Sequence, residues 1–196
     1  MTTPPAFSIC VYCGSRNGTL PAYTDVAREV GTWIGRHKGQ LVYGGGNNGL
    51  MGVVAQATAD AGGRVVGIIP HALQTQENTR TACTELHVVN TMHERKHRMA
   101  ERADVFLALP GGIGTFEELF EAWTWRQLGY HDKPIGILNT AGYYDGLLSF
   151  AQTSVSAGFL SDWQMDLIRS GTEVSALLRE LVEAAGFSPD SQLRDI

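Results

Sequence analysis

Short apolar runs rich in Val, Ile and Leu recur along the chain, and longer segments with the periodicity of helices separate them. Uninterrupted apolar runs of this kind are typical of strands in a parallel sheet, because helices cover both faces of such a sheet. We expect strands at residues 7–12, 40–43, 64–69, 85–89, 105–109 and 134–138. We expect helices at residues 21–38, 50–61, 92–102, 116–127, 144–156 and 172–185.

The alternation of predicted strands and helices continues without a repeat, a low-complexity block or a proline-rich linker. It therefore predicts an α/β fold with a mostly parallel, doubly wound sheet. We expect one domain over residues 1–196, with a polar tail from about residue 187. Ligands of such folds bind beyond the carboxyl ends of the strands, so the loops at 13–15, 43–46, 69–70 and 109–112 are the candidate sites.

The composition narrows the class of partner. Hydrophobic residues make up 43% of the chain and charged residues 18%, as in soluble globular proteins. The net charge of -5 provides no general attraction to nucleic acid or to an anionic membrane, so we expect neither as a partner.

The cysteines and the N-terminus indicate the compartment. The three cysteines are an odd number, which argues against a disulfide framework, and the N-terminus lacks the pattern of a signal peptide. We expect a cytoplasmic protein.

Segment 110–118 carries the strongest signal for a ligand, because it follows a predicted apolar strand and opens an amphipathic helix. Glycines allow the backbone to approach a ligand closely, and the free N–H groups at a helix N-terminus favour a phosphate. Gly111, Gly112 and Gly114 are therefore candidates for a phosphate site. Thr115 could cap the helix or donate its hydroxyl to the same anion. A glycine-rich turn without a ligand is the alternative.

Acidic residues follow these glycines within about one helical turn. Glu118 could reach the group that is attached to a bound phosphate. Helix geometry places Glu121 on nearly the same face and Glu117 on a neighbouring one. The alternative is that these acids complement the dipole of the first turn.

A basic segment at 92–99 begins a predicted helix directly after the strand at 85–89. Arg95 and Lys96 would project from the same edge of the sheet as the glycines of segment 110–118. A solvated basic face is the alternative interpretation.

The same segment contains a zinc-protease pattern, in which His93 and His97 lie four residues apart beside Glu94. Arg95 and Lys96 between them would repel a cation, and no third ligand follows at a familiar spacing. We therefore expect no metal site.

Two other patterns point to cofactor or redox chemistry. Gly44, Gly46 and Gly49 match a dinucleotide-binding motif, but they follow the second strand, and the next strand ends without the acidic residue that would bind a ribose. Close approach of the backbone to a ligand or to another loop explains these glycines better. Cys10 and Cys13 form a C-x-x-C, but they lie on and just after a buried strand, where we expect them to pack as small apolar side chains.

The chain resembles the LOG ("lonely guy") family of cytokinin-activating phosphoribohydrolases. It carries the family motif Pro-Gly-Gly-x-Gly-Thr-x-x-Glu at 110–118 and the motif Met-x-x-Arg-Lys at 92–96. Further matching segments lie at 13–15, 43–46, 49–52 and 127–134, in the order of the family.

The resemblance implies a Rossmann-like fold and a function. The implied reaction is hydrolysis of the N-glycosidic bond of cytokinin riboside 5′-monophosphates or of AMP, which releases the free base and ribose 5-phosphate. It implies no metal and no other cofactor, and a homodimer or higher homo-oligomer. The name lysine decarboxylase, once attached to similar proteins, requires a pyridoxal phosphate lysine, and the chain has few lysines and no recognisable site for that cofactor. A non-catalytic nucleotide sensor or carrier is the alternative.

The resemblance also assigns residues. Arg95 and Glu118 become the catalytic pair, since a fixed carboxylate can stabilise an oxocarbenium-like sugar or position water, and an arginine stays charged. Glu77 matches a glutamate that contacts the substrate. The remaining predicted binding residues are Ser15, Gly45, Met92, Lys96, Gly111, Gly112, Gly114, Thr115 and Glu117.

The base pocket is the least specified part of the site. Met99, Trp123 and Trp125 are candidates to line an apolar pocket for the base, and packing in the core is the alternative for each. The sequence does not indicate which N6 side chain is preferred.

Overall fold

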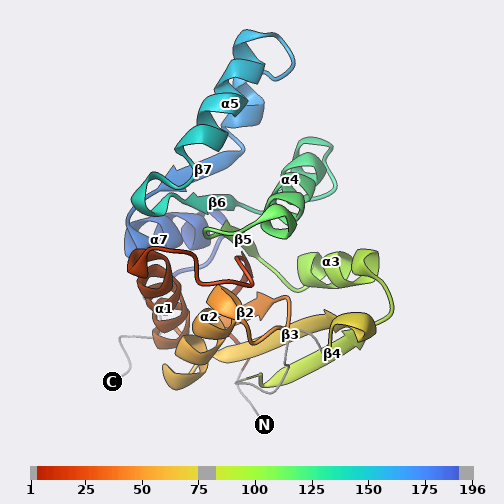
Figure 1. Cartoon of the computed structure of the whole chain (residues 1–196), viewed down its shortest axis with the longest axis vertical. Helices are drawn as coiled ribbons and strands as arrows, with labels where there is room; N and C mark the ends of the chain where they lie inside the picture. Colours follow the sequence, from red (N-terminus) through yellow and green to blue (C-terminus); the bar gives the residue numbers. More distant parts are fainter. Residues whose placement is uncertain (1–3, 75–82, 190–196) are drawn as a thin grey trace.

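Seven parallel strands form one sheet in the computed structural model, which describes residues 4–74 and 83–189 (Figure 1). The order across the sheet is β4-β3-β2-β1-β5-β6-β7. The strands are β1 (Ser8–Tyr12), β2 (Gln40–Tyr43), β3 (Arg64–Pro70), β4 (Glu85–Val89), β5 (Val105–Ala108), β6 (Ile135–Leu138) and β7 (Ile168–Gly171). The helices are α1 (Pro21–Arg36), α2 (Gly49–Asp60), α3 (Met92–Glu101), α4 (Ile113–Gln127), α5 (Asp145–Ser156), α6 (Asp162–Met165) and α7 (Val174–Ala184), with short 3-10 turns η1 (His71–Leu73) and η2 (Thr140–Gly142).

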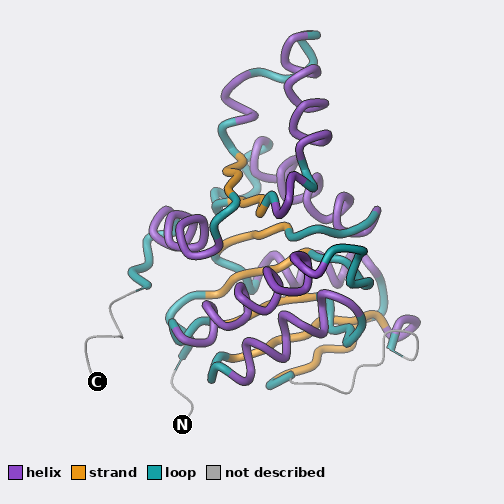
Figure 2. The backbone as a smooth tube through the Cα atoms, turned by 60° about the vertical axis from the view of Figure 1, so that its left-hand side comes forward, coloured by secondary structure: helices purple, strands orange, loops and turns teal. Residues whose placement is uncertain are grey.

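Helices cover both faces of the sheet, as the apolar strands require (Figure 2). Side chains of α1, α2 and α7 pack in one hydrophobic core, and side chains of α3, α4 and α5 pack in the other. Strand β1 shows how a strand contributes to both, because Ile9 and Val11 belong to the first core while Cys10 and Tyr12 belong to the second. The expected doubly wound fold is confirmed.

The strand order reverses at β1, and this reversal creates the crevice in which a ligand can bind. Strand β1 pairs with β2 on one side and with β5 on the other, in parallel register. The chain leaves β1 toward α1 on one face and leaves β5 toward α4 on the opposite face. The loops that follow these neighbouring strands therefore diverge and leave room between them.

The predicted strands and helices are confirmed, with small shifts at their ends, and one strand, one short α-helix and the two 3-10 turns were not predicted. Helix α4 begins at Ile113, three residues earlier than expected, because Gly112 is already its N-cap. Strand β7 reads Ile-Arg-Ser-Gly and is partly exposed at the sheet edge, so it lacks the apolar run by which the other strands were recognised. The four-residue helix α6 begins with a Ser161–Gln164 capping box.

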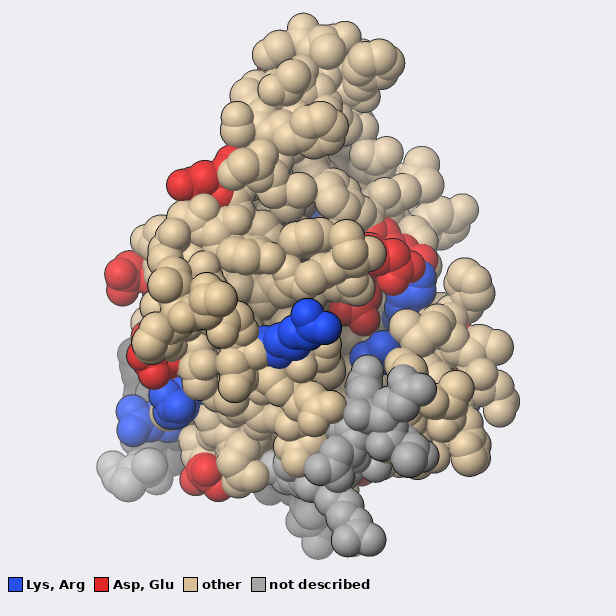
Figure 3. Space-filling model, in the orientation of Figure 1, with Lys and Arg blue, Asp and Glu red and all other residues tan. Residues whose placement is uncertain are grey.

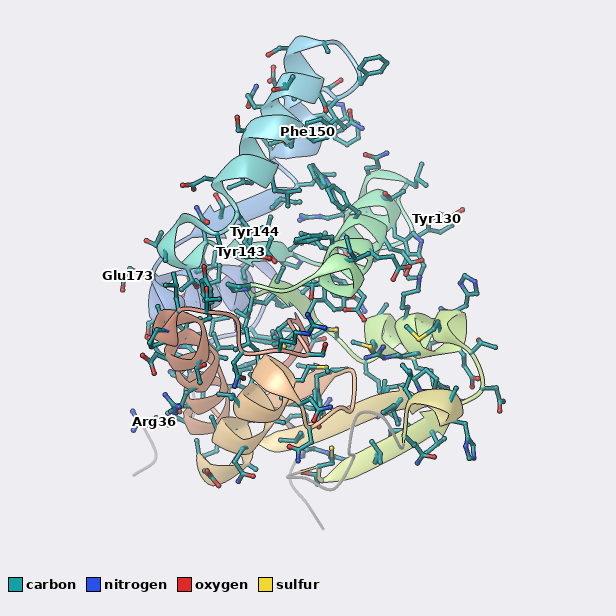
Figure 4. All side chains as sticks on the ribbon, in the orientation of Figure 1. Arg36, Tyr130, Tyr143, Tyr144, Phe150 and Glu173 are labelled. Carbon is teal, nitrogen blue, oxygen red and sulfur yellow. The ribbon has the colours of Figure 1, made fainter. Side chains whose placement is uncertain are left out.

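Helix α5 and the segment after it project beyond the sheet at the top of Figure 1. This projection carries exposed apolar side chains: Phe150 is 67% exposed, Phe159 86% and Trp163 54%. Phe150 is labelled on it in Figure 4. Among the described residues, no helix combines the length and the apolar character needed to cross a membrane.

The packing of α1 on α2 allows a stability prediction. A Cβ atom added at Gly31 would lie 2.4 Å from the backbone oxygen of Val54 and 2.8 Å from Cβ of Ala57. We expect Gly31→Ala to lower the free energy of unfolding by about 1–3 kcal/mol, because the two helices must move apart. Denaturant unfolding followed by circular dichroism measures this change.

Gly146→Ala is the matched control. No atom lies within 4 Å of a Cβ added at Gly146, in α5. Alanine is a better helix former than glycine, so this variant should be as stable as the wild type or more stable, by up to about 1 kcal/mol. Equal stability of Gly31→Ala and wild type would contradict the described helix contact.

Candidate active site

A cavity of about 400 Å³ lies in the crevice where the strand order reverses. One part of its wall comes from the loop after β1 and the starts of α1 and α2. The other part comes from α3, the β5–α4 connection with the first turns of α4, and the loop before α5. Figure 3 shows basic and acidic side chains close together near the middle of the face that it presents. The charged residues that line the cavity are Arg16, Arg95, Glu117 and Glu118.

The connection from β5 to α4 forms the glycine-rich wall, and we call Gly111, Gly112, Gly114 and Thr115 the cradle. All of them line the cavity. Nothing lies within 4 Å of a Cβ added at Gly112 or Gly114, so space is open beside both. The N-cap residue of α4 is Gly112, which has no side chain to accept a hydrogen bond from the first turn. Its orphan N–H groups suit an anion.

Thr115 lies in the first turn of α4 and is 4% exposed. The N-cap is Gly112, so the predicted possibility that Thr115 caps the helix is wrong. A Cβ added at Gly111 would lie 2.1 Å from Oγ1 of Thr115, so only glycine fits at that position. The Thr115 side chain thus packs beneath the backbone of the cradle. A role for its hydroxyl in binding an anion stays a prediction.

Arg95 projects from α3 into the cavity wall with only 7% of its side chain exposed. Its Nε donates to the carbonyl oxygen of Ile68 at 3.2 Å, and its Nη2 donates to the carbonyl oxygen of Gly44 at 3.1 Å. A Cβ added at Gly44 would lie 1.8 Å from Nη2. The guanidinium of Arg95 can occupy this position only because residue 44 is a glycine and has no side chain.

Glu118 approaches the same guanidinium from α4. Its Oε1 lies 4.0 Å from Nη1 of Arg95, and 11% of its side chain is exposed. Both residues line the cavity. The structure thus brings together the two predicted catalytic residues, with opposite charges, in a largely buried position one helical turn past the cradle.

Lys96 follows Arg95 on α3 but does not line the cavity. Its ammonium donates to Glu117 and, at 3.0 Å, to Glu121, and 7% of its side chain is exposed. Burial acts to lower the pKa of Lys96, but the hydrogen bonds and charges of the two carboxylates outweigh it and raise that pKa. Lys96 is therefore a charged link between α3 and α4. Glu121 pairs with Glu117 around this lysine instead of facing the cavity with Glu118.

The other predicted binding residues divide into three groups. Ser15 and Met92 line the cavity, as does Glu117 despite its ion pair with Lys96. Gly45 does not line it: its backbone has a φ of +77°, and an added Cβ would lie 3.1 Å from Cβ of Ile69. Glu77 lies outside the described residues.

Some residues of the cavity were missed in the sequence. Tyr23 comes from α1, Tyr143 from the loop after β6, and Arg16 follows the predicted residue Ser15. The rings of Tyr23 and Tyr143 meet edge to face, with centroids 5.7 Å apart. The position of Tyr143 after the carboxyl end of a strand is the signal that could have identified it.

Other candidate patterns have structural explanations. Cys10 and Cys13 lie in different hydrophobic cores, and burial raises the pKa of both thiols. A Cβ added at Gly49 would lie 2.3 Å from the backbone N of Arg16, so the glycine at this position allows the start of α2 to contact the loop after β1. Met99 and Trp123 pack in the core. Of the candidate residues Cys10, Cys13, Gly49, Met99 and Trp123, Cys13 alone lines the cavity.

The zinc-protease pattern is exposed on α3. His97 pairs with Glu101 at 3.1 Å, and 66% of its side chain is exposed. Within residues 4–74 and 83–189, no group of three or more His, Cys, Asp or Glu side chains is arranged to hold a metal ion.

Solved structures with the same fold include two proteins named for molybdenum cofactor. A molybdenum cofactor binding protein from Rippkaea orientalis aligns with a TM-score of 0.69 and 22% identity, over 94% of this chain and 98% of that one. The Moco carrier protein of Chlamydomonas reinhardtii aligns with a TM-score of 0.70 and 22% identity, over 94% of this chain and 99% of that one. At this identity the likeness concerns the fold.

Sequence comparisons are more specific. A family described as "Possible lysine decarboxylase" matches residues 51–181. The cytokinin riboside 5′-monophosphate phosphoribohydrolase LOG3 of Arabidopsis thaliana is 48% identical over 90% of this chain and 82% of its own length. LOG1 of the same plant, which has the same enzyme name, is 47% identical over 88% of this chain and 81% of its own length. The chain therefore belongs to the LOG family, as its motifs around Arg95 and Glu118 predicted.

Proposed function

We propose that this protein hydrolyses the N-glycosidic bond of cytokinin riboside 5′-monophosphates, of AMP, or of both, and releases the free base and ribose 5-phosphate. The observation that carries the proposal is the Arg95–Glu118 pair on the wall of the cavity, one turn from an uncapped, glycine-rich helix N-terminus. The names of relatives that share almost half of the residues support the same reaction.

The cradle provides the anchor for the substrate. A 5′-phosphate bound at the N-terminus of α4 would accept hydrogen bonds from backbone N–H groups and interact with the positive end of the helix dipole. Open space beside Gly112 and Gly114 leaves room for its oxygens. From that position, the ribose would extend toward Glu118. A chain with a net charge of -5 can thus bind an anion through a local site.

Glu118 is the group that we assign to the reacting carbon. Departure of the base leaves positive charge on the sugar, and a fixed carboxylate stabilises that charge or orients the attacking water. Arg95 is a poor general base because it stays protonated, so we assign it to orientation and charge balance. Its hydrogen bonds to the carbonyl groups of Gly44 and Ile68 fix the guanidinium before substrate binds.

The lysines of the chain do not support a pyridoxal phosphate-dependent decarboxylation, the reaction that the family description suggests. A pyridoxal phosphate lysine must be free to form a Schiff base. The lysines of the chain are Lys38, Lys96 and Lys133. Lys96 is held by two carboxylates with a raised pKa, and Lys133 donates to the carbonyl oxygen of Ala100 at 2.6 Å. Lys38 lies just beyond the end of α1 and does not line the cavity.

A cytoplasmic location is part of the proposal. The three cysteines are free thiols, two of them buried and one partly buried. Such a set of unpaired thiols agrees with a reducing compartment.

Glu118→Gln tests the assignment of the carboxylate. We expect kcat to fall by a factor on the order of 10² to 10⁴, because the amide cannot balance the charge on the sugar. Purified protein is incubated with AMP and, separately, with isopentenyladenosine 5′-monophosphate in the presence of a chelator. Chromatography then follows the release of base and ribose 5-phosphate.

Glu101→Gln is the control, since Glu101 is exposed at the end of α3, pairs with His97 and does not line the cavity. Its kcat should stay within about threefold of wild type, because a side chain away from the substrate contributes little to the transition state. Undiminished release by Glu118→Gln would overturn the catalytic assignment. Binding of both nucleotides without release by the wild type would favour a sensor or carrier instead.

Gly44→Ala tests the preorganisation of Arg95. The added methyl group would occupy the position of Nη2, and the flexible guanidinium can yield where the backbone cannot. We expect kcat/KM to fall by about 10²-fold, because a small displacement of a catalytic group is costly, while the fold persists. Steady-state kinetics and thermal unfolding separate the two effects. Gly146→Ala serves as control, and wild-type kinetics for Gly44→Ala would contradict this account of residue 44.

We also propose that the protein is a homodimer or a higher homo-oligomer. Apolar side chains are exposed around the cavity and on α4: Ile113 is 82% exposed, Met92 40% and Phe120 38%. Exposed apolar surface beside a binding site is typical of an interface between chains. Light scattering coupled to gel filtration should give at least twice the chain mass of 21.3 kDa. A monomer mass at micromolar concentration would reject the proposal.

A further inference from the structure

Two consecutive tyrosines of the loop between β6 and α5 hold the strand-to-helix connection that forms the cradle. The hydroxyl of Tyr143 donates to the carbonyl oxygen of Gly111. The hydroxyl of Tyr144 donates to the carbonyl oxygen of Leu109 at 2.6 Å. Tyr144 is fully buried, whereas Tyr143 is 37% exposed and lines the cavity. Figure 4 labels both side chains next to each other at this loop.

Every carbonyl group between the end of β5 and the cap of α4 has a donor. The carbonyl oxygen of Pro110, between the two that the tyrosines hold, accepts from the backbone N of Gly14 at 3.0 Å. The peptide bonds here are trans, so each C=O and the following N–H point in opposite directions. A donor that fixes the Gly111 carbonyl therefore also fixes the direction of the Gly112 N–H. That N–H belongs to the cradle.

The Tyr143 ring is itself held from two sides. It meets the ring of Tyr144 edge to face, with centroids 5.0 Å apart and planes at 90°. It meets the ring of Tyr23, on α1, at 5.7 Å and 76°. Edge-to-face contacts of this kind favour one ring orientation. The hydroxyl of Tyr143 therefore has little freedom to leave the Gly111 carbonyl.

The backbone before Tyr143 is in an unusual conformation. Ala141 has a φ of +52°, in the left-handed region, which costs a residue with a Cβ about 1–2 kcal/mol. The side-chain oxygen of Asn139 accepts from the backbone N of Tyr144 at 2.7 Å and helps to hold the turn. Strain that the surrounding contacts hold in place is common beside functional sites. This turn is what directs both hydroxyl groups to the cradle connection.

We propose that Tyr143 is a positioning residue for phosphate recognition: its hydroxyl fixes the Gly111–Gly112 peptide so that the Gly112 N–H faces the 5′-phosphate. The inference rests on the proposed function for the identity of the substrate. Tyr143 acts through the cradle and takes no part in breaking the glycosidic bond. Its loss should therefore weaken the binding of every ligand that presents the phosphate, including the product ribose 5-phosphate.

Tyr143→Phe removes the hydroxyl and keeps the ring against Tyr23 and Tyr144. We expect calorimetry to show about three- to tenfold weaker binding of ribose 5-phosphate, the effect of one hydrogen bond. KM for AMP should rise by a similar factor, while kcat stays within about twofold of wild type. The melting temperature should stay close to that of wild type, because the ring remains.

Tyr130→Phe is the matched control. Tyr130 is 76% exposed and lies at the far end of α4 from the cradle, as Figure 4 shows. Removal of its hydroxyl should change neither the affinity for ribose 5-phosphate nor the kinetic constants. An equal loss of affinity in both tyrosine variants would overturn the assignment to Tyr143.

The possible failures can be told apart. Wild-type affinity of Tyr143→Phe for ribose 5-phosphate would overturn the inference, and so would a fall in kcat at unchanged KM. A wild-type protein that binds ribose 5-phosphate but releases no base would contradict the proposed function alone, because the binding comparison remains valid. A wild-type protein that does not bind ribose 5-phosphate would overturn the role of Tyr143 as well.

Discussion

The arrangement of the site depends on the buried guanidinium of Arg95, because the surrounding groups must compensate its charge. A charged group with 7% of its side chain exposed is costly to bury unless hydrogen bonds and an opposite charge compensate. Two carbonyl oxygens, from Gly44 and Ile68, accept from it, and the carboxylate of Glu118 lies across from it. Gly44 follows β2, Ile68 lies within β3, and Glu118 belongs to α4. The charge therefore ties α3 to β3, to the loop after β2 and to α4.

The charged residues of α3 and α4 form two separate sets: Arg95 with Glu118 lines the cavity, and Lys96 with its two glutamates links the helices. Arg95 and Lys96 are adjacent on α3 and project about 100° apart, and in this arrangement Arg95 lines the cavity while Lys96 faces Glu117 and Glu121. Glu117 and Glu121 are four residues apart and share a face, which suits them to one lysine between the helices. That pairing leaves Glu118 directed to Arg95. The ion pairs of Lys96 thus fix the relative position of two helices whose other faces form the site.

Much of the architecture could be predicted from the sequence, because apolar runs covered on both faces leave a strong pattern. Strand β7 could not, since its sequence of Ile, Arg, Ser and Gly at the sheet edge has no such run. The glycine motif and its position after a strand predicted which residues line the cavity at α4. The orientation of Lys96 depends on where α4 packs, and no pattern within α3 contains that information. The role of Tyr143 could not be predicted for a similar reason, because its hydrogen bond to Gly111 joins residues 32 positions apart.

The cradle is an ordinary feature of this fold with two modifications, a glycine N-cap and fixed carbonyl groups before it. Any helix that follows a parallel strand presents N–H groups at the carboxyl edge of the sheet, and a side chain at the N-cap usually satisfies one of them. Gly112 offers no such side chain, and the carbonyl groups before it all have donors from neighbouring loops. The N–H groups of Gly111 and Gly112 are thus held in fixed directions, and no side chain caps the first turn of α4. Under the proposed function, fixing these donors in advance would lower the cost of ordering when an anion binds, and a chain of net negative charge would select a phosphate in this way.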